Sequence, residues 1–153
     1  MTDQDDKQDL SSLKMILWLV YLSLFFSLFI YALVILVIPP PEEFVPPEIA
    51  RGNPPKILII LGFASLALVP ILQNLRKRMF FEPLGEECYP GSTEARSAYF
   101  TMSLTTWIMC ELIGVFGFVV HFLTYEPFMA MPFVVLAAVL MGWYRPQTDV
   151  AEE

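Results

Sequence analysis

The sequence predicts an all-α membrane protein with four transmembrane helices and with both the N- and C-termini cytoplasmic. Of its 153 residues, 56% are hydrophobic, whereas soluble domains are usually about 45–50% apolar. The apolar residues gather in four blocks, separated by segments rich in proline, glycine and charge. A chain of about 150 residues forms one domain, so we expect residues 1–153 to be a single integral membrane domain without a soluble catalytic part.

The first apolar block, residues 15–38, contains no charged residue and predicts a helix at about 14–38. With a rise of about 1.5 Å per residue it is longer than a hydrocarbon core of about 30 Å, so it crosses with a tilt. The block is too long for the core of a signal peptide and follows an acidic segment, which indicates an uncleaved helix. Proline ends it at Pro39, Pro40 and Pro41, because proline has no amide hydrogen and clashes with the preceding turn.

The second block predicts a helix at about 57–75, which ends where three basic residues, Arg76, Lys77 and Arg78, mark the membrane surface. Near its end, Pro70 predicts a kink or a local break.

The third block predicts a long helix at about 98–125. Glu126 and Pro127 make a tight corner, and the fourth helix follows at about 127–144. It closes with an aromatic and basic interface anchor, which consists of Trp143, Tyr144 and Arg145.

Lysine and arginine residues set the predicted orientation. With the N-terminus inside, the cytoplasmic segments hold seven basic residues and the outer segments hold two. The seven are Lys7, Lys14, Arg76, Lys77, Arg78, Arg96 and Arg145, and the two are Arg51 and Lys56. This positive-inside bias places both termini in the cytoplasm and suits a bacterial-type inner membrane.

Much of the negative charge behind the formal net charge of −7 lies in the tails, residues 1–13 and 146–153, which we expect to be flexible. An acidic chain is a poor partner for nucleic acid. The expected partners are membrane lipids, together with other membrane protein subunits or further copies of the chain in a homo-oligomer. The two cysteines, Cys88 and Cys110, show neither disulfide nor metal spacing.

Small and weakly polar residues recur at three- and four-residue spacing along the third block. They are Ser103, Thr106, Cys110, Gly114, Gly117, His121 and Thr124. On a helix they form one stripe, and such stripes let membrane helices approach closely. The stripe therefore predicts a helix-packing interface, either within the chain or with another subunit.

Glu111 lies in the middle of the third block with no basic residue nearby in sequence. An ionised carboxylate at this depth costs at least about 2.5–3.5 kcal/mol, and desolvation favours its neutral form. It is about 100° around the helix from Cys110, on the flank of the stripe, where it can face a neighbouring helix or a seam between subunits. Three roles are open: a structural acid bonded to a hydroxyl or carbonyl, a proton- or ion-exchanging site, and an ion pair with a partner protein's base.

The sequence requires no cofactor, although it leaves haem and quinone open. His121 is about 15 Å along the helix from Glu111, and a lone histidine near the outer interface is expected to be hydrogen-bonded or to meet lipid headgroups. A haem would need a second axial ligand, and the spacing selects none of the methionines. A quinone or lipid could bind between the aromatic first helix and its neighbours.

Glu111, Gly114, Phe116 and Gly117, followed by aliphatic residues, resemble the carboxylate helix of the rotary ATPase proteolipid, subunit c. The resemblance covers about residues 72–123 and implies that Glu111 carries a transported proton or cation. The preceding helix has Gly62 as its single glycine, where proteolipids place glycines at four-residue spacing.

The sequence contains no phosphate-binding glycine loop, nucleophile–base pair or metal motif, so we do not expect an enzyme. Small size, the packing stripe and the lack of a soluble domain favour a structural or accessory subunit of a larger inner-membrane complex. One alternative is a proteolipid-like subunit that translocates protons or cations through Glu111. A second alternative is a quinone- or lipid-binding membrane subunit.

Overall fold

The structure, a computed structural model, describes residues 3–52, 54–78 and 93–146, and the regular secondary structure of these residues is helical. The α-helices are α1 (Asp3–Val37), α2 (Lys56–Arg76), α4 (Thr93–Thr124) and α5 (Pro127–Trp143), and a short 3-10 helix, η1 (Glu48–Ala50), precedes α2. The described residues contain no strand. The prediction of an all-α fold is confirmed.

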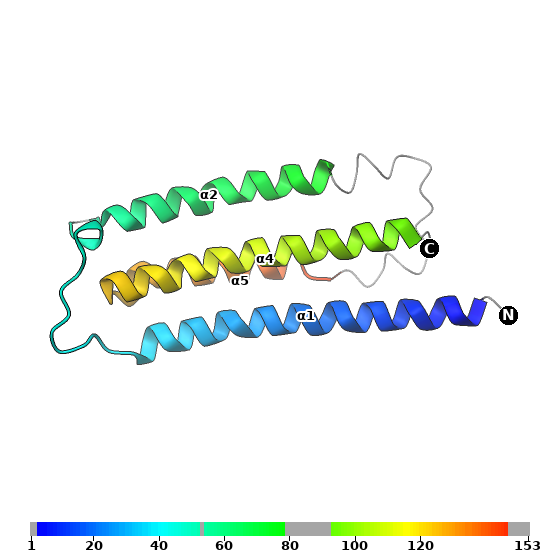
Figure 1. The fold of residues 1–153 in the computed structure, drawn as a ribbon, viewed down its shortest axis with the longest axis horizontal. Helices are drawn as coiled ribbons and strands as arrows, with labels where there is room; N and C mark the ends of the chain where they lie inside the picture. The colour runs from blue at the N-terminus through cyan, green and yellow to red at the C-terminus, as the bar shows by residue number, and fades with distance from the viewer. Residues whose placement is uncertain (1–2, 53, 79–92, 147–153) are drawn as a thin grey trace.

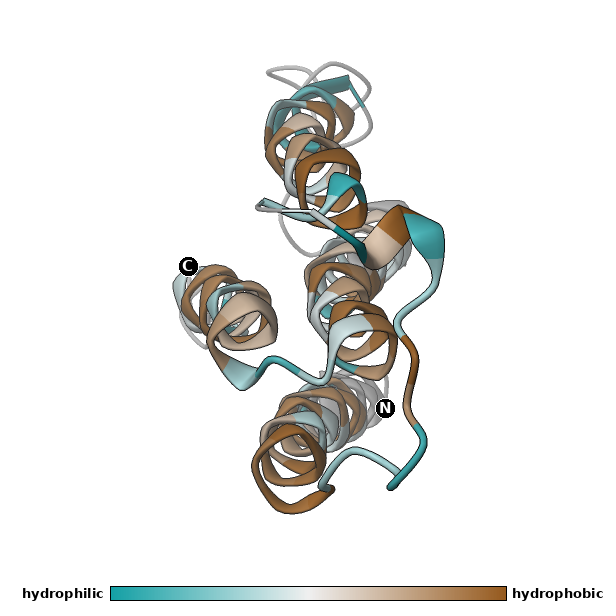
Figure 2. Ribbon diagram, turned by 90° about the vertical axis from the view of Figure 1, so that its left-hand side faces the viewer, coloured by the Kyte–Doolittle hydropathy of each residue, from teal (hydrophilic) through white to brown (hydrophobic). Residues whose placement is uncertain are grey.

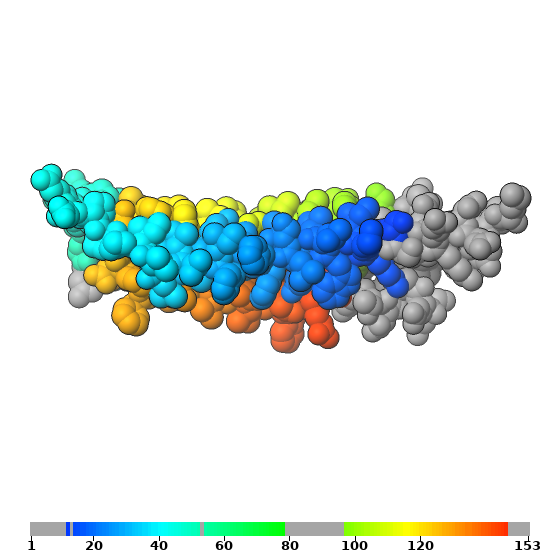
Figure 3. Space-filling view, turned by 90° about the horizontal axis from the view of Figure 1, so that it is seen from below, coloured from blue at the N-terminus to red at the C-terminus, as the bar shows by residue number. Residues whose placement is uncertain are grey.

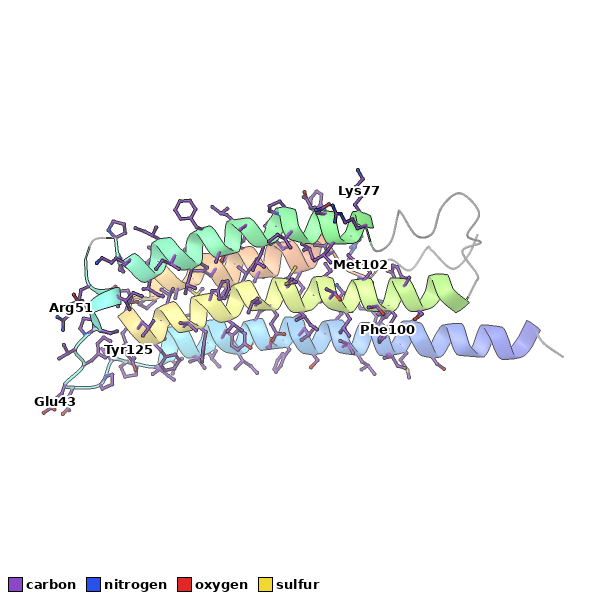
Figure 4. All side chains as sticks on the ribbon, turned by 45° about the horizontal axis from the view of Figure 1, so that its top comes forward. Glu43, Arg51, Lys77, Phe100, Met102 and Tyr125 are labelled. Atoms are coloured by element: carbon purple, nitrogen blue, oxygen red, sulfur yellow. The ribbon has the colours of Figure 1, made fainter. Side chains whose placement is uncertain are left out.

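The helices run alternately up and down, so the start of α1 and the end of α5 lie toward one end of the bundle (Figure 1). The segment between α1 and α2 and the corner between α4 and α5 lie at the other end. Lys77 lies at the first end and Arg51 at the second (Figure 4). The basic residues expected on the cytoplasmic side and those expected on the outer side are therefore at opposite ends of the bundle.

Three helical segments are long and apolar enough to cross a membrane: Lys14–Val37 of α1, all of α2, and Ser97–Thr124 of α4. The fourth helix, α5, is apolar but has 17 residues. At about 1.5 Å per residue it is shorter than a typical hydrocarbon core.

Some helix boundaries differ from those expected. Helix α1 begins at Asp3, so it runs through most of the acidic segment that was predicted to be a flexible tail. Helix α2 continues through Pro70, where a local break was one expectation. The Pro70 side chain is exposed, and a membrane helix tolerates proline where the freed backbone carbonyl finds another partner or a local adjustment. The expected tail at 146–153 lies, apart from its first residue, outside the described residues.

Helix α4 is the centre of the bundle, because it packs extensively against α5, α1 and α2, whereas α5 makes only a slight contact with α2. Viewed along the helices, α1, α4 and α2 lie in a row, and α5 lies beside the α1–α4 pair (Figure 2). The buried core is therefore concentrated around α4, with Trp107, Cys110, Ile113 and Val120 all at 2% exposure or less. By contrast α1 lies across one face of the molecule with a broad free surface (Figure 3).

The corner between α4 and α5 is tight. Tyr125 adopts a left-handed backbone conformation with φ 52°, which is uncommon for a residue other than glycine. The Tyr125 amide donates to the His121 carbonyl at 2.6 Å, and the Glu126 amide donates to the Thr124 hydroxyl at 3.2 Å. Pro127 then starts α5 at a position where its missing amide hydrogen is not needed.

Candidate functional site

The glycines of α4 allow the close packing on which the site depends. A Cβ atom at Gly117 would lie 2.7 Å from the Ala130 carbonyl oxygen and 2.9 Å from the Phe133 Cβ, both on α5. A Cβ atom at Gly114 would overlap the Leu28 side chain of α1. Gly117 therefore faces α5, and Gly114 faces the seam between α4 and α1.

The structure places the predicted stripe of α4 inside the chain. Thr106, Cys110, Gly114, Gly117 and His121 are buried, and Ser103 and Thr124 at its two ends are half-buried. The Thr106 and Thr124 hydroxyls donate to the backbone carbonyls one turn earlier, at 2.7 and 2.8 Å. Helices α1 and α5 pack against the middle of this stripe, so its buried residues form an interface within the chain.

Glu111 bridges α4 and α1. The Ser27 hydroxyl of α1 donates to Glu111 Oε1 at 2.5 Å, and the Tyr31 hydroxyl donates to the same oxygen at 3.2 Å. The Ser27 oxygen also lies 2.7 Å from the Leu24 carbonyl. One carboxylate oxygen thus accepts hydrogen bonds from both hydroxyls. This polar contact lies midway along the apolar spans of both helices.

The second oxygen of Glu111, Oε2, is open. It makes no hydrogen bond to a described residue, and it is not among the buried polar atoms that lack a partner. Since Glu111 is half-buried, the one oxygen faces α1 and the other reaches the surface of the chain. Among the described residues, therefore, Oε1 has hydrogen-bond partners and Oε2 has none.

The position of Glu111 on α4 lies on the side of the α1–α4 pair that faces away from α5. Steps of three residues from Gly117 to Gly114 to Glu111 each turn about 60° around the helix, from α5 toward α1 and past it. In the view along the helices, α5 occupies one side of the pair and no described α-helix occupies the other (Figure 2). We call this surface the Glu111 face and define it by Glu111, Ser23 and Ile30 of α1, and Ile108 and Phe122 of α4, all exposed except half-buried Glu111.

His121 is placed differently from the expectation. Its side chain is 1% exposed, and neither ring nitrogen has a hydrogen-bond partner among the described residues. The backbone of Ile38 approaches the ring without meeting ordinary hydrogen-bond geometry. Aromatic rings enclose it instead, with Phe122 at 5.6 Å and Tyr125 at 5.3 Å between ring centroids. A histidine at the membrane interface was expected to be hydrogen-bonded or to meet headgroups, but the tight corner after α4 folds over this one and buries it.

At the other end of the bundle, hydrogen bonds from aromatic side chains of α4 and α1 hold the end of α5. Trp107 Nε1 donates to the Tyr144 carbonyl at 2.7 Å, and the Tyr21 hydroxyl donates weakly to the Met141 carbonyl at 3.4 Å. These carbonyls belong to the last turn of α5 and the residue after it, where no intrahelical partner remains. The Arg76 guanidinium lies 4.5 Å from the Tyr144 ring centroid, which ties the end of α2 to the same point.

The sequence pattern indicates Glu111 as a candidate site residue but does not indicate its partners. Ser27 and Tyr31 are four residues apart, so both hydroxyls lie on one face of an otherwise apolar helix. That spacing was the available signal. Nothing in the sequence indicated that this face meets α4 at the depth of Glu111, because α1 and α4 are far apart in the chain.

The two hydroxyls should contribute measurably to the stability of the α1–α4 contact. We expect Ser27→Ala and Tyr31→Phe each to lower the free energy of unfolding by about 0.6–1.7 kcal/mol, the range for interhelical hydrogen bonds in membranes. Unfolding in mild micelles with increasing denaturing detergent measures this. Ser23→Ala is the control, since Ser23 is exposed on the same helix. Equal effects of Ser23→Ala and Ser27→Ala would contradict the assignment.

Comparison with known proteins finds no matching family model, no matching curated sequence and no matching solved structure. The functional interpretation therefore depends on the geometry of Glu111 and its surroundings.

Proposed function

We propose that the protein is a membrane-embedded structural or accessory subunit that binds another membrane protein chain through the Glu111 face. In this proposal α1, α2, α4 and α5 all lie in the inner membrane, with both termini in the cytoplasm. The chain has no role as an enzyme, and it holds its partner in place within a larger complex.

The open oxygen of Glu111 is the observation that supports this proposal. Lipid tails offer no hydrogen-bonding group, and an unsatisfied polar group in hydrocarbon costs several kcal/mol. Oε2 lies midway along a 28-residue apolar span, too deep for headgroups at either end. A polar side chain from another chain supplies the hydrogen-bond partner for Oε2 that neither lipid nor this chain provides.

The surrounding surface is suited to such contact. Ile108 is 51% exposed and Ile30 is 44% exposed, on either side of the α1–α4 seam. Together with Phe122 they form an apolar surface around Glu111, and Ser23 is the other polar residue of the face. Membrane helices associate through close apolar packing with a few hydrogen bonds, and the Glu111 face offers both.

Photocross-linking in native membranes tests the proposal. A photoreactive amino acid at Ile108 should give one defined cross-link to a membrane protein, and the cross-link should weaken strongly when Glu111→Leu is added. Val139 is the matched control position, because it is 61% exposed on α5 and lies at a similar depth on the opposite side of the bundle. Equal, diffuse cross-linking at both positions, unaffected by Glu111→Leu, would refute the proposed function.

The same oxygen favours a second candidate, proton or cation exchange at Glu111. An accessible carboxyl midway along the span can take up and release a proton when a partner chain supplies a polar path. Reconstitution of the isolated complex in vesicles would test this through proton uptake. Wild-type rates in the Glu111→Gln complex would exclude exchange and leave the structural role.

A further inference from the structure

We infer that the neighbouring ends of α2 and α5 bind the phosphate headgroup of an anionic phospholipid. The site is the basic cluster, which consists of Arg76, Lys77, Arg78 and Arg145. The inference rests on one part of the proposed function, that the helices lie in a membrane. It does not require a partner chain at the Glu111 face.

Tyr144 brings the basic residues of α2 to the end of α5. The Arg76 guanidinium lies 4.5 Å from the Tyr144 ring centroid. A cation–π contact of this kind positions the charge, but it does not satisfy the five N–H donors of the guanidinium. Arg145 follows Tyr144 in the chain and is exposed. Residues with guanidinium groups therefore come together here from α2 and from the end of α5.

The end of α5 does not itself need these cations. The last carbonyls of a helix lack intrahelical partners and attract basic side chains. Here the Tyr21 hydroxyl donates to the Met141 carbonyl, and Trp107 Nε1 donates to the Tyr144 carbonyl. Within the part of the chain that the structure describes, neither guanidinium donates a hydrogen bond. Their donors therefore remain for an acceptor from outside this part of the chain.

Positive charge at this end has no counterpart among the described carboxylates. Lys77 lies at this end of the bundle, whereas Glu43 lies at the opposite end (Figure 4). The carboxylates whose side chains the structure describes are Glu111 midway along α4 and Glu42, Glu43, Glu48 and Glu126 in the segments at the opposite end. At that opposite end Arg51 Nε also donates to the Pro46 carbonyl at 2.9 Å. An anionic group complements the basic cluster, and the described side chains at this end do not supply one.

The depth of the basic cluster identifies this group as a lipid phosphate. Trp143, next to Tyr144, is 81% exposed, and exposed tryptophan and tyrosine lie at headgroup level in membrane proteins. Arginine binds phosphate through two parallel hydrogen bonds, and exposed Lys77 and Arg78 add attraction for negative charge. Zwitterionic lipids carry the same phosphate, but their ammonium group would meet the positive charge of the cluster. The basic cluster therefore prefers an anionic lipid.

Quenching of Trp143 by brominated lipids tests the inference. The full-length chain carrying Trp18→Phe is reconstituted in phosphatidylcholine vesicles with a minor share of phosphatidylglycerol. Trp143 then supplies the accessible fluorescence, because Trp107 is 1% exposed. Bromine is placed on the acyl chains of phosphatidylglycerol in one sample and of an equal share of phosphatidylcholine in the other. The binding constant for phosphatidylglycerol relative to phosphatidylcholine should be at least about 5, the effect of one basic residue near an anionic headgroup.

Three variants show which residues cause the preference. Arg76→Gln combined with Arg145→Gln should abolish it, while circular dichroism shows that the helices are retained. Arg76→Lys keeps the charge but should lose most of the preference, because lysine cannot bind phosphate through a planar fork of two donors. Lys56→Gln is the matched control, since Lys56 is exposed at the opposite end of α2. This control should leave the preference unchanged.

Two sets of outcomes overturn the inference. The first is equal quenching by the two brominated lipids, or a preference that survives the double glutamine variant. The second is full preference in Arg76→Lys or equal loss in Lys56→Gln, which would indicate diffuse attraction by charge instead of a site. The proposed function is tested separately: if the lipid preference is absent while Ile108 still cross-links to one membrane protein, the proposed function stands without the lipid site. A lipid preference without that cross-link would retain the lipid site alone.

Discussion

Gly117→Ala should lower the free energy of unfolding by about 2–3 kcal/mol, near the top of the range for overpacked sites. The added methyl group would meet the Ala130 carbonyl oxygen at 2.7 Å and the Phe133 Cβ at 2.9 Å. Both atoms belong to the rigid part of α5, so neither can rotate away. Helix α5 must therefore move off α4, which also loosens the neighbouring contacts of Val134. Denaturation in micelles measures the loss.

The chain supplies two controls for this substitution. Gly142→Ala places a methyl group where nothing lies within 4 Å, so it should be neutral or stabilise by up to about 1 kcal/mol through helix propensity. Gly114→Ala should fall between the two, because its clash is with the end of the flexible Leu28 side chain. A Gly117→Ala protein as stable as Gly142→Ala would contradict the close approach of α4 and α5.

Trp107→Ala should cost about 3–5 kcal/mol, as expected for removing a buried tryptophan. The indole is 1% exposed and packs against the Tyr21 ring at 5.3 Å between centroids. Its Nε1 also donates to the Tyr144 carbonyl at 2.7 Å. The substitution leaves a cavity between α1, α4 and α5 and an unpaired carbonyl at the end of α5. Unfolding monitored by circular dichroism gives the loss of stability.

Trp143→Ala is the matched control for this prediction. Trp143 is 81% exposed on the adjacent helix, and surface substitutions usually change stability by less than about 0.5 kcal/mol. Trp107→Phe should lose less than Trp107→Ala, because the ring remains and the hydrogen bond alone disappears. Equal losses of stability for Trp107→Ala and Trp143→Ala would contradict the role of Trp107 in holding α5 against α4.

The sequence predicts the helices well because their causes are local. Long charge-free blocks, the three prolines after residue 38 and the Glu126–Pro127 corner determine where helices run and turn. The buried stripe on α4 follows from three- and four-residue spacing. Its use within the chain could not be predicted, because spacing does not reveal which helix covers the stripe.

The missing parts of the site depend on packing between distant segments. Ser27 and Glu111 are 84 residues apart, and their contact requires α1 to lie against α4 at one particular depth. The burial of His121 likewise involves a distant segment, because the backbone of Ile38 at the end of α1 lies near its ring. The residue types at these positions do not by themselves indicate the contacts. Sequence patterns find the polar residue in the apolar helix, and the three-dimensional packing decides what satisfies it.

Reaction of Glu111 with an apolar carbodiimide tests most directly whether its second oxygen is open and is covered by a partner. The isolated chain, dispersed in detergent, should be modified at Glu111, which mass spectrometry of the chain locates. In native membranes Glu111 should be protected, while the exposed carboxyl of Glu126 reacts equally with a water-soluble carbodiimide in both preparations. Failure to modify Glu111 in the isolated chain, or equal modification in both preparations, would contradict the account.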